Sequence, residues 1–185
     1  MQSPTPWVPQ QPATRTEIDA KLTVELASVV AAARRRALRD GDRQIDTAHL
    51  LHSLIETDPG VRTALGDVAQ VARVLGYLVQ RSIGYGLRWQ GSVEHSGAVP
   101  GVRGSAVRDR HAEVPGWSPS AVVAMESAIE RAGLRGGARA GGVDLLAGIA
   151  ADRECRAVEV LGRAGVDVEL LAGRLAALSR HVSQG

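Results

Sequence analysis

The sequence has little of what extracellular and membrane-spanning proteins rely on. It contains one cysteine, Cys155, which excludes an internal disulfide and is typical of a reducing compartment. No stretch approaches the roughly 18 consecutive apolar residues that a membrane span requires. Residues 1–17 show neither the basic start nor the apolar run of a signal peptide. We therefore expect a cytoplasmic protein that does not enter membranes.

Aromatic and lysine residues are also scarce. Aromatics make up 3% of the chain and Phe does not occur, so a core must be built from small and branched aliphatic side chains, which favours closely packed helices. Of the 22 basic residues only Lys21 is lysine, and it lies between Ala20 and Leu22. A P-loop needs Gly-Lys followed by Ser or Thr, so the chain cannot hydrolyse ATP by that route. The net charge of +2 is weak evidence for a nucleic-acid surface.

Composition divides the 185 residues into two foldable segments and two others. Residues 1–16 hold four of the eight prolines, which predicts a flexible arm. Residues 82–116 are rich in Gly and Arg and lack apolar periodicity. Such a long connection is either functional or disordered, and the composition favours disorder. The remaining segments, 17–81 and 117–180, are predicted to pack together as one domain.

An internal repeat relates these two segments. A shift of 95 positions places Arg36-Ala37 on Arg131-Ala132, Gly41 on Gly136, Leu50-Leu51 on Leu145-Leu146, and Leu54 on Ile149. A repeated supersecondary unit cannot bury its apolar face alone, so the two copies should pack against each other. We predict an all-α fold of two pseudo-symmetric repeats.

Capping residues and apolar patterns predict four helices in each repeat, since a cap offers an acceptor for the free N–H groups of a helix start. In the first repeat the starts are Thr23, Asp46 or Thr47, Asp58-Pro59, and Asp67. In the second they are Trp117-Ser118-Pro119, Val143, Asp152, and Asp167. Gly41 supplies the left-handed residue at which the first helix ends.

This order of motifs resembles the repeat of the Clp ATPase N-terminal domain. Residues 45–51 read Ile-Asp-Thr-Ala-His-Leu-Leu, where the family commonly has Ile-Gly-Thr-Glu-His-x-Leu-Leu. In the second repeat Trp117-Ser118-Pro119 stands in place of aromatic-Thr-Pro, and residues 141–149 correspond to the same loop and helix. The likeness covers about residues 22–81 and 117–178. It implies two four-helix repeats that receive substrates and adaptors of Clp unfoldases, here without the ATPase modules.

Some relatives bind phosphorylated arginine with a Thr at the first helix and the motif Glu of each repeat. Here Thr23 keeps the first hydroxyl and Ser118 replaces the second, but Ala48 and Val143 occupy the glutamate positions. Losing a charged hydrogen-bond partner costs about 1.5–3 kcal/mol per bond, so we expect weak or absent phosphoarginine binding. The candidate ligand or partner contacts are Thr23, Arg34, Arg35, Thr47, Ala48, His49, Trp117, Ser118, Val143 and Asp144.

Catalysis and metal binding find little support in the sequence. His49 has no organised companions in the sequence, so a structural hydrogen bond is the favoured reading over a catalytic base. His49 and His52 share a helix face, but without a Cys cluster or an HExxH pattern we predict no metal and no cofactor. Cys155 lies near Asp152 and Glu154, whose charges disfavour a thiolate.

We therefore expect a non-catalytic, monomeric binding module whose partners are Clp protease components, adaptors or substrate proteins, with peptides or cyclic peptides as further ligands. The run Arg34-Arg35-Arg36, with Arg39 and Arg43, is either a solvated helix face or a patch for an acidic segment of a partner. The alternative function is an arginine-rich nucleic-acid-associated protein.

Overall fold

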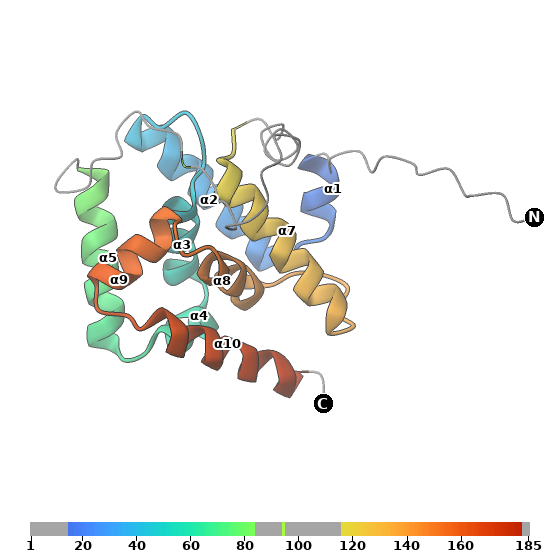
Figure 1. The fold of residues 1–185 in the computed structure, drawn as a ribbon. Coiled ribbons are helices and arrows are strands. Elements are labelled where there is room, and N and C mark those ends of the chain that lie inside the picture. Colours follow the sequence, from blue (N-terminus) through green and yellow to red (C-terminus); the bar gives the residue numbers. More distant parts are fainter. Residues whose placement is uncertain (1–14, 84–93, 95–115, 183–185) are drawn as a thin grey trace, which may run out of the picture.

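The computed structural model describes residues 15–83, Glu94 and residues 116–182 (Figure 1). Over these ranges the chain is all-helical, as predicted, and forms no strand. The helices are α1 (Arg15–Ala20), α2 (Val24–Asp40), α3 (Thr47–Thr57), α4 (Pro59–Leu65), α5 (Val68–Ser82), α7 (Pro119–Leu134), α8 (Gly142–Ala151), α9 (Arg156–Arg163) and α10 (Val168–Val182). Most of the predicted arm and of the predicted linker lies outside the described residues.

Most of the predicted caps are present at helix starts. The Thr23 hydroxyl accepts the Leu26 N–H at 3.2 Å, and the Ser118 hydroxyl accepts the Ala121 N–H at 3.1 Å. The remaining carboxylate caps are Asp46, Asp58, Asp67 and Asp167. Helix α2 ends at Gly41, whose φ of 74° favours a residue without a Cβ. These caps satisfy N–H groups that have no partner inside the helix, so local sequence sets the helix starts.

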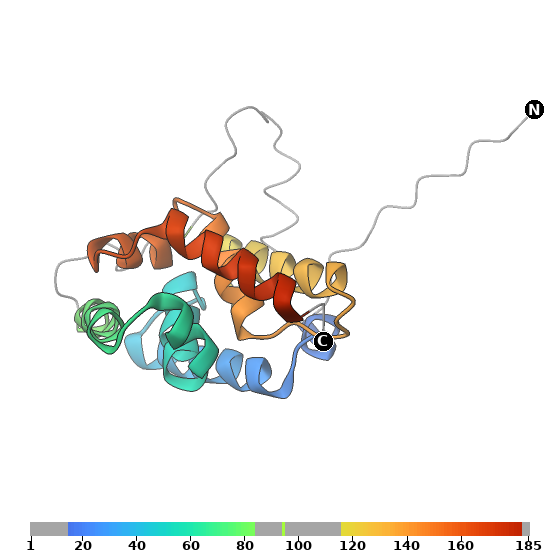
Figure 2. The ribbon, with the colours of Figure 1, turned by 90° about the horizontal axis from the view of Figure 1, so that it is seen from below.

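Helices α3 and α8 lie at the centre of the molecule, with the other helices around them (Figures 1 and 2). Helix α2 packs along α3 and α7 along α8, and α3 also contacts α8 and α9. The core is aliphatic, as the composition predicts. Its largest fully buried side chains are Leu26, Ile45, Leu50, Leu51, Leu54, Ile55, Leu78, Met125, Leu145, Leu146, Ile149 and Leu161. A membrane-crossing helix would need a longer apolar stretch than any helix in the described part of the chain has.

Two backbone pairings join loops that lie far apart in the sequence. Leu22 pairs in parallel with Ala140, and Ile45 pairs in parallel with Trp117. Each pairing contains two backbone hydrogen bonds of 2.8–2.9 Å. The loop before α2 is thereby held against the loop before α8, and the loop before α7 against the loop before α3.

The structure differs from the sequence prediction at two helix starts. Helix α1 begins at Arg15, inside the predicted arm, and buries Ile18 at 3% exposure. Helix α9 begins at Arg156 instead of Asp152. The Asp152 carboxylate accepts the Glu154 N–H at 3.1 Å and so stabilises a turn, since short acidic side chains compete with helix for nearby backbone N–H groups.

Candidate functional site

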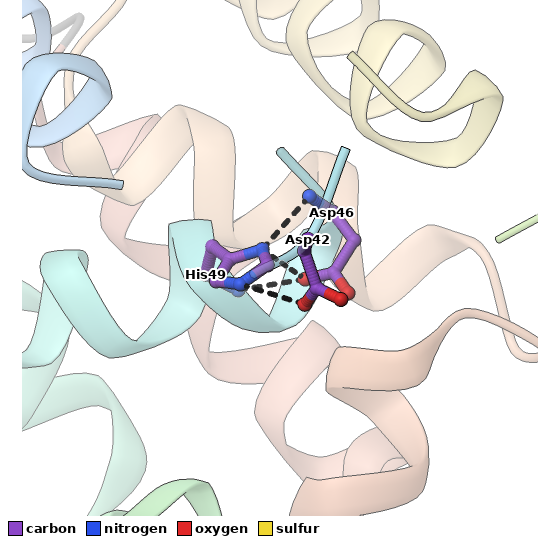
Figure 3. Close-up of side chains that lie close together, drawn as sticks. All are labelled: Asp42, Asp46 and His49. Atoms are coloured by element: carbon purple, nitrogen blue, oxygen red, sulfur yellow. Dashed lines mark hydrogen bonds and ion pairs between the residues drawn. The ribbon is translucent and has the colours of Figure 1, made fainter. Parts of the chain in front are cut away.

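The capping box at the start of α3 is buried in the core. The Asp46 Oδ1 atom accepts the His49 N–H at 2.9 Å, and the Asp46 N–H points to His49 Nδ1 at 3.1 Å (Figure 3). The two side chains are 2% and 1% exposed. His49 therefore has the structural hydrogen bond expected from the sequence, and its ring orientation is fixed by the first turn of the helix.

Two arginines from other helices converge on Asp46. Arg81 of α5 pairs with Asp46 Oδ2 and also lies 3.2 Å from Asp42. The Arg156 Nη1 atom of α9 donates to the same Oδ2 at 2.7 Å, and this side chain is 8% exposed. One carboxylate thus links α3, α5 and α9. Removing one partner of a buried pair typically costs about 3–5 kcal/mol, because the other charge is left unpaired.

The outer edge of the His49 ring faces two more carboxylates. Its Nε2 atom lies 3.2 Å from Asp42 Oδ2 and 3.6 Å from Asp40 Oδ2. Burial lowers the pKa of His49, but hydrogen bonds to Asp42 and Asp46 outweigh this effect and raise the pKa above its ordinary value. Burial raises the pKa of Asp46, yet the hydrogen bond and charge of His49 together with Arg81 bring it well below the usual range. The two carboxylates thus make the ring easier to protonate, although a protonated Nδ1 no longer accepts the Asp46 N–H.

Glu94 inserts its carboxylate at the point where α3, α7 and α9 begin, and it is 5% exposed. Its Oε2 atom accepts the Thr47 N–H at 2.9 Å and the Ser118 hydroxyl at 2.7 Å. Its Oε1 atom accepts the Arg156 N–H at 2.7 Å and the Thr47 hydroxyl. Four donors thus converge on one anion, as at other helix N-termini that bind carboxylates.

Among the described residues, the hydroxyls at this site donate to Glu94 and the nearby thiol is buried. The hydroxyls of Thr47 and Ser118 both donate to Glu94, so neither is paired with His49. Cys155 is buried at the N-cap of α9, and burial is the main cause that raises the pKa of its thiol to about 12. The side chains at this site form buried ion pairs and cap helix starts.

The other candidate residues fall into two groups. Thr23 and Ser118 cap α2 and α7, Trp117 is 2% exposed in a loop pairing, and Ala48 is fully buried. Asp144 forms the capping box of α8 and pairs with Arg135. Arg34 and Val143 are half-buried, and Arg35 is exposed. The structure gathers Thr47, His49 and Ser118 in one region and leaves Arg35 of α2 at the surface.

His52 does not join His49, although both lie on α3. Its Nδ1 atom is 3.2 Å from Arg36 Nη1, and its Nε2 atom is 3.5 Å from Glu56. Burial, followed by the charge of Arg36, lowers the pKa of His52 to about 4. The two histidines face different partners and do not form a two-histidine metal site.

Sequence reasoning missed Glu94, Arg81 and Arg156 as members of this cluster. Each contacts residues that are 35 to 110 positions away along the chain. Asp46 was identified as a possible cap, but no local pattern indicates that two arginines reach it. Apolar periodicity likewise cannot indicate a buried carboxylate within a Gly-rich segment.

Comparison with known proteins supports the fold alone. No protein-family model matches the sequence, and a search among curated proteins found no match. A solved structure described as "Preliminary structural investigations of a malarial protein secretion system" is similar, with a TM-score of 0.60 and 14% identity. The likeness covers 89% of this chain and 95% of that one. At this identity the chain shares an all-helical architecture with that protein.

Proposed function

We propose that this chain is a non-catalytic protein- or peptide-binding module of the kind found at the N-terminus of Clp unfoldases. In this proposal it engages adaptors, substrates or components of a Clp protease system, and either delivers them or competes with the unfoldase's own domain. The proposal combines the sequence resemblance with two features of the fold.

The first feature is the order of the helices. Helices α2 to α5 contain 17, 11, 7 and 15 residues, and α7 to α10 contain 16, 10, 8 and 15. Matching lengths in the same order support two copies of one four-helix unit, as the 95-residue shift predicts.

The second feature, which carries the proposal furthest, is the pair of loop contacts. Adding 95 to Leu22 and Ile45 gives Trp117 and Ala140, and the observed pairings are Leu22 with Ala140 and Ile45 with Trp117. In each pairing, the loop before the first helix of one repeat contacts the loop before the second helix of the other repeat. Exchange of equivalent contacts is what a pseudo-two-fold axis between two repeats would produce.

Phosphoarginine is not the ligand that this proposal favours. The two positions of the family's glutamates hold Ala48, which is fully buried, and Val143, which packs against the core. Neither side chain can accept a hydrogen bond from a guanidinium group.

The surface that we assign to the partner is the arginine face of α2. Arg35 and Arg39 are exposed there, and both suit an acidic segment because guanidinium groups bind carboxylates in a bidentate manner. Charged surface groups of this kind steer association and set specificity.

The experiment is a pull-down from host lysate with mass spectrometry, followed by titration of the purified Clp ATPase and peptidase subunits. We expect the Clp subunits to be enriched, and a variant with Arg35→Glu and Arg39→Glu to bind them about tenfold more weakly. Arg139→Glu, an equally exposed charge in the second half, should leave affinity unchanged.

Two results would contradict the proposal. Equal binding by the double variant and the wild type would show that the arginine face of α2 does not bind the partner. Recovery of nucleic acid without Clp subunits, with affinity falling steeply as salt is added, would favour the nucleic-acid alternative.

A further inference from the structure

Helix α2 has one buried face and one outer face that none of the described helices covers. Its buried side packs along α3, and the helix lies along the lower edge of the molecule in Figure 2. On the outer side Val24 and Leu38 are apolar, yet they are 72% and 73% exposed. Ala31 lies midway between them and is also exposed. Apolar side chains that align on an uncovered helix face, unlike scattered ones, indicate an interaction surface.

The three apolar residues recur every seven positions. Seven residues make about two turns of an α-helix, so Val24, Ala31 and Leu38 form one stripe along α2. A seven-residue apolar repeat is the pattern by which one helix packs along another. The central residue is alanine, whose small side chain lets a second backbone approach closely. The outer face of α2 therefore suits a helix.

The charges beside this stripe have opposite signs at its two ends. Glu25 lies at the N-terminal end, and Arg35 and Arg39 lie at the C-terminal end. All three side chains are exposed. At about 100° per residue they also project from the same flank of the stripe. A face that is acidic at one end and basic at the other is complementary to a second copy of itself in antiparallel orientation.

The alanine at the centre sets the register of such a pair. When Ala31 lies opposite its own copy, Val24 lies opposite Leu38 of the partner subunit. Position 25 then faces position 37, so Glu25 lies between two arginines of the partner subunit, each displaced by about 3 Å along the helix axis. Twofold symmetry repeats these contacts at the other end. A parallel pair would instead place each charge beside its own copy, where like charges repel.

We propose that two copies of this chain dimerise through antiparallel α2 helices, with Ala31 at the twofold axis and Glu25 between two arginines of the partner subunit. This dimer differs from the monomer expected from the sequence, which did not show which side of α2 the fold leaves uncovered. The dimer covers Arg35 and Arg39, to which the proposed function assigns an acidic partner segment, so the two associations should compete. The dimer itself does not depend on the proposed function.

Sedimentation of the purified full chain, from about 1 to about 300 μM, tests the dimer. The wild type should show a concentration-dependent equilibrium between monomer and dimer, since two short helix faces form an interface near the lower limit for specific complexes. Leu38→Asp should weaken dimerisation at least about tenfold, because it buries a charge opposite Val24. Leu170→Asp should dimerise as the wild type does, since Leu170 is 54% exposed on α10, on the other side of the molecule from α2 (Figure 2).

Charge reversal tests the register. Glu25→Arg should weaken the dimer at least about tenfold, and so should the double variant Arg35→Glu, Arg39→Glu, because each brings like charges together. Combining all three substitutions inverts both sides of each pair and should restore the affinity to within about threefold of the wild type. The triple variant should still fail to bind an acidic partner, so failure of the dimer and failure of the proposed function are distinguishable.

Three results would overturn the dimer. The first is a wild type that remains monomeric at the highest concentration, and the second is undiminished dimerisation of Leu38→Asp. The third is a triple variant that associates no better than Glu25→Arg, which would show that these charges do not meet across the twofold axis. Because all the substituted side chains are exposed, each variant should remain folded, and its circular dichroism provides the check.

Discussion

At the start of α3 the residue three positions after the N-cap is His49, and at the start of α8 it is Asp144. Both side chains accept the N-cap backbone N–H, at 3.1 Å in α3 and 3.0 Å in α8. The charged partner nine positions earlier in the chain differs in sign, since Asp40 faces His49 and Arg135 faces Asp144. Asp40 and Arg135 are separated by the same 95 positions as the two caps.

The two helix starts therefore perform one backbone task with different side chains, a carboxylate in α8 and an imidazole in α3, which accepts at Nδ1 only when that nitrogen carries no proton. The Asp144–Arg135 pair is bidentate, and this hydrogen bond raises the pKa of Arg135 further, so its charge persists at all ordinary pH values. The α3 cluster instead contains an imidazole, whose pKa is raised by hydrogen bonds to Asp42 and Asp46. Among the described residues, the α3 cluster and not the α8 start also binds arginines from two other helices. The difference indicates that α3 connects helices of both halves, whereas α8 is capped locally.

The largest expected effect follows from removing the N-cap of α3. Asp46→Ala deletes the cap and leaves Arg156 buried without this carboxylate, which should lower the free energy of unfolding by about 3–5 kcal/mol. Asp144→Ala should cost only about 1–2 kcal/mol, because Arg135 is 20% exposed and can return to water. Urea unfolding of both variants measures the contrast, and equal losses would show that the two starts are equivalent.

Glu94→Ala should destabilise the fold by about 3 kcal/mol, since buried donors lose their acceptor at roughly 1–3 kcal/mol each. The donors affected are the N–H groups of Thr47 and Arg156 and the hydroxyls of Thr47 and Ser118. Added formate should recover part of the lost Tm, whereas chloride at equal ionic strength should not. A variant as stable as the wild type would mean that water replaces the carboxylate.

Gly148 makes the contact between α7 and α8 close, because a Cβ there would overlap the Ala124 carbonyl oxygen. Gly148→Ala should therefore lower stability by about 1–3 kcal/mol. Gly76→Ala is the matched control, since a Cβ on Gly76 of α5 meets open space. It should raise stability by about 0.5–1 kcal/mol, because alanine loses less entropy in a helix. Thermal unfolding of the two variants tests whether their changes in stability have opposite signs.

The smallest expected effect is a reversal in how the free energy of unfolding depends on pH, measured by urea unfolding over a range of pH. His52 has a folded pKa of about 4, so its contribution is present above its ordinary value of 6.5 and is lost as pH falls towards 4. His49 has a raised pKa, so its contribution is complete below 6.5 and is lost as pH rises through the folded pKa. Stability should be greatest near the ordinary pKa of the two histidines.

Single substitutions separate these two contributions. His52→Asn should remove the loss on the acidic side, and His49→Asn should remove the loss on the alkaline side. If the alkaline loss persists in His49→Asn, then another group carries it.

The elements that the sequence predicted well are those with local causes. Thr23, Asp58 and Ser118 cap helices where their short polar side chains predict caps, and Gly41 ends α2. The start of α9 was wrong because Asp152 has two local hydrogen-bonding options, and the turn was preferred over the cap. The all-helical class followed from apolar periodicity together with the scarcity of aromatic residues.

The candidate site could be predicted only in part, since Thr47, His49 and Ser118 were identified but their shared partner, Glu94, was not. By itself the sequence determined the helices and their caps, because these depend on interactions over three or four residues. Tertiary structure alone decided which charges meet at Asp46, because Arg81 and Arg156 reach it from 35 and 110 positions away. Burial makes these ion pairs important for stability, because a charge removed from water needs a partner that is close in space, even when that partner is distant along the chain.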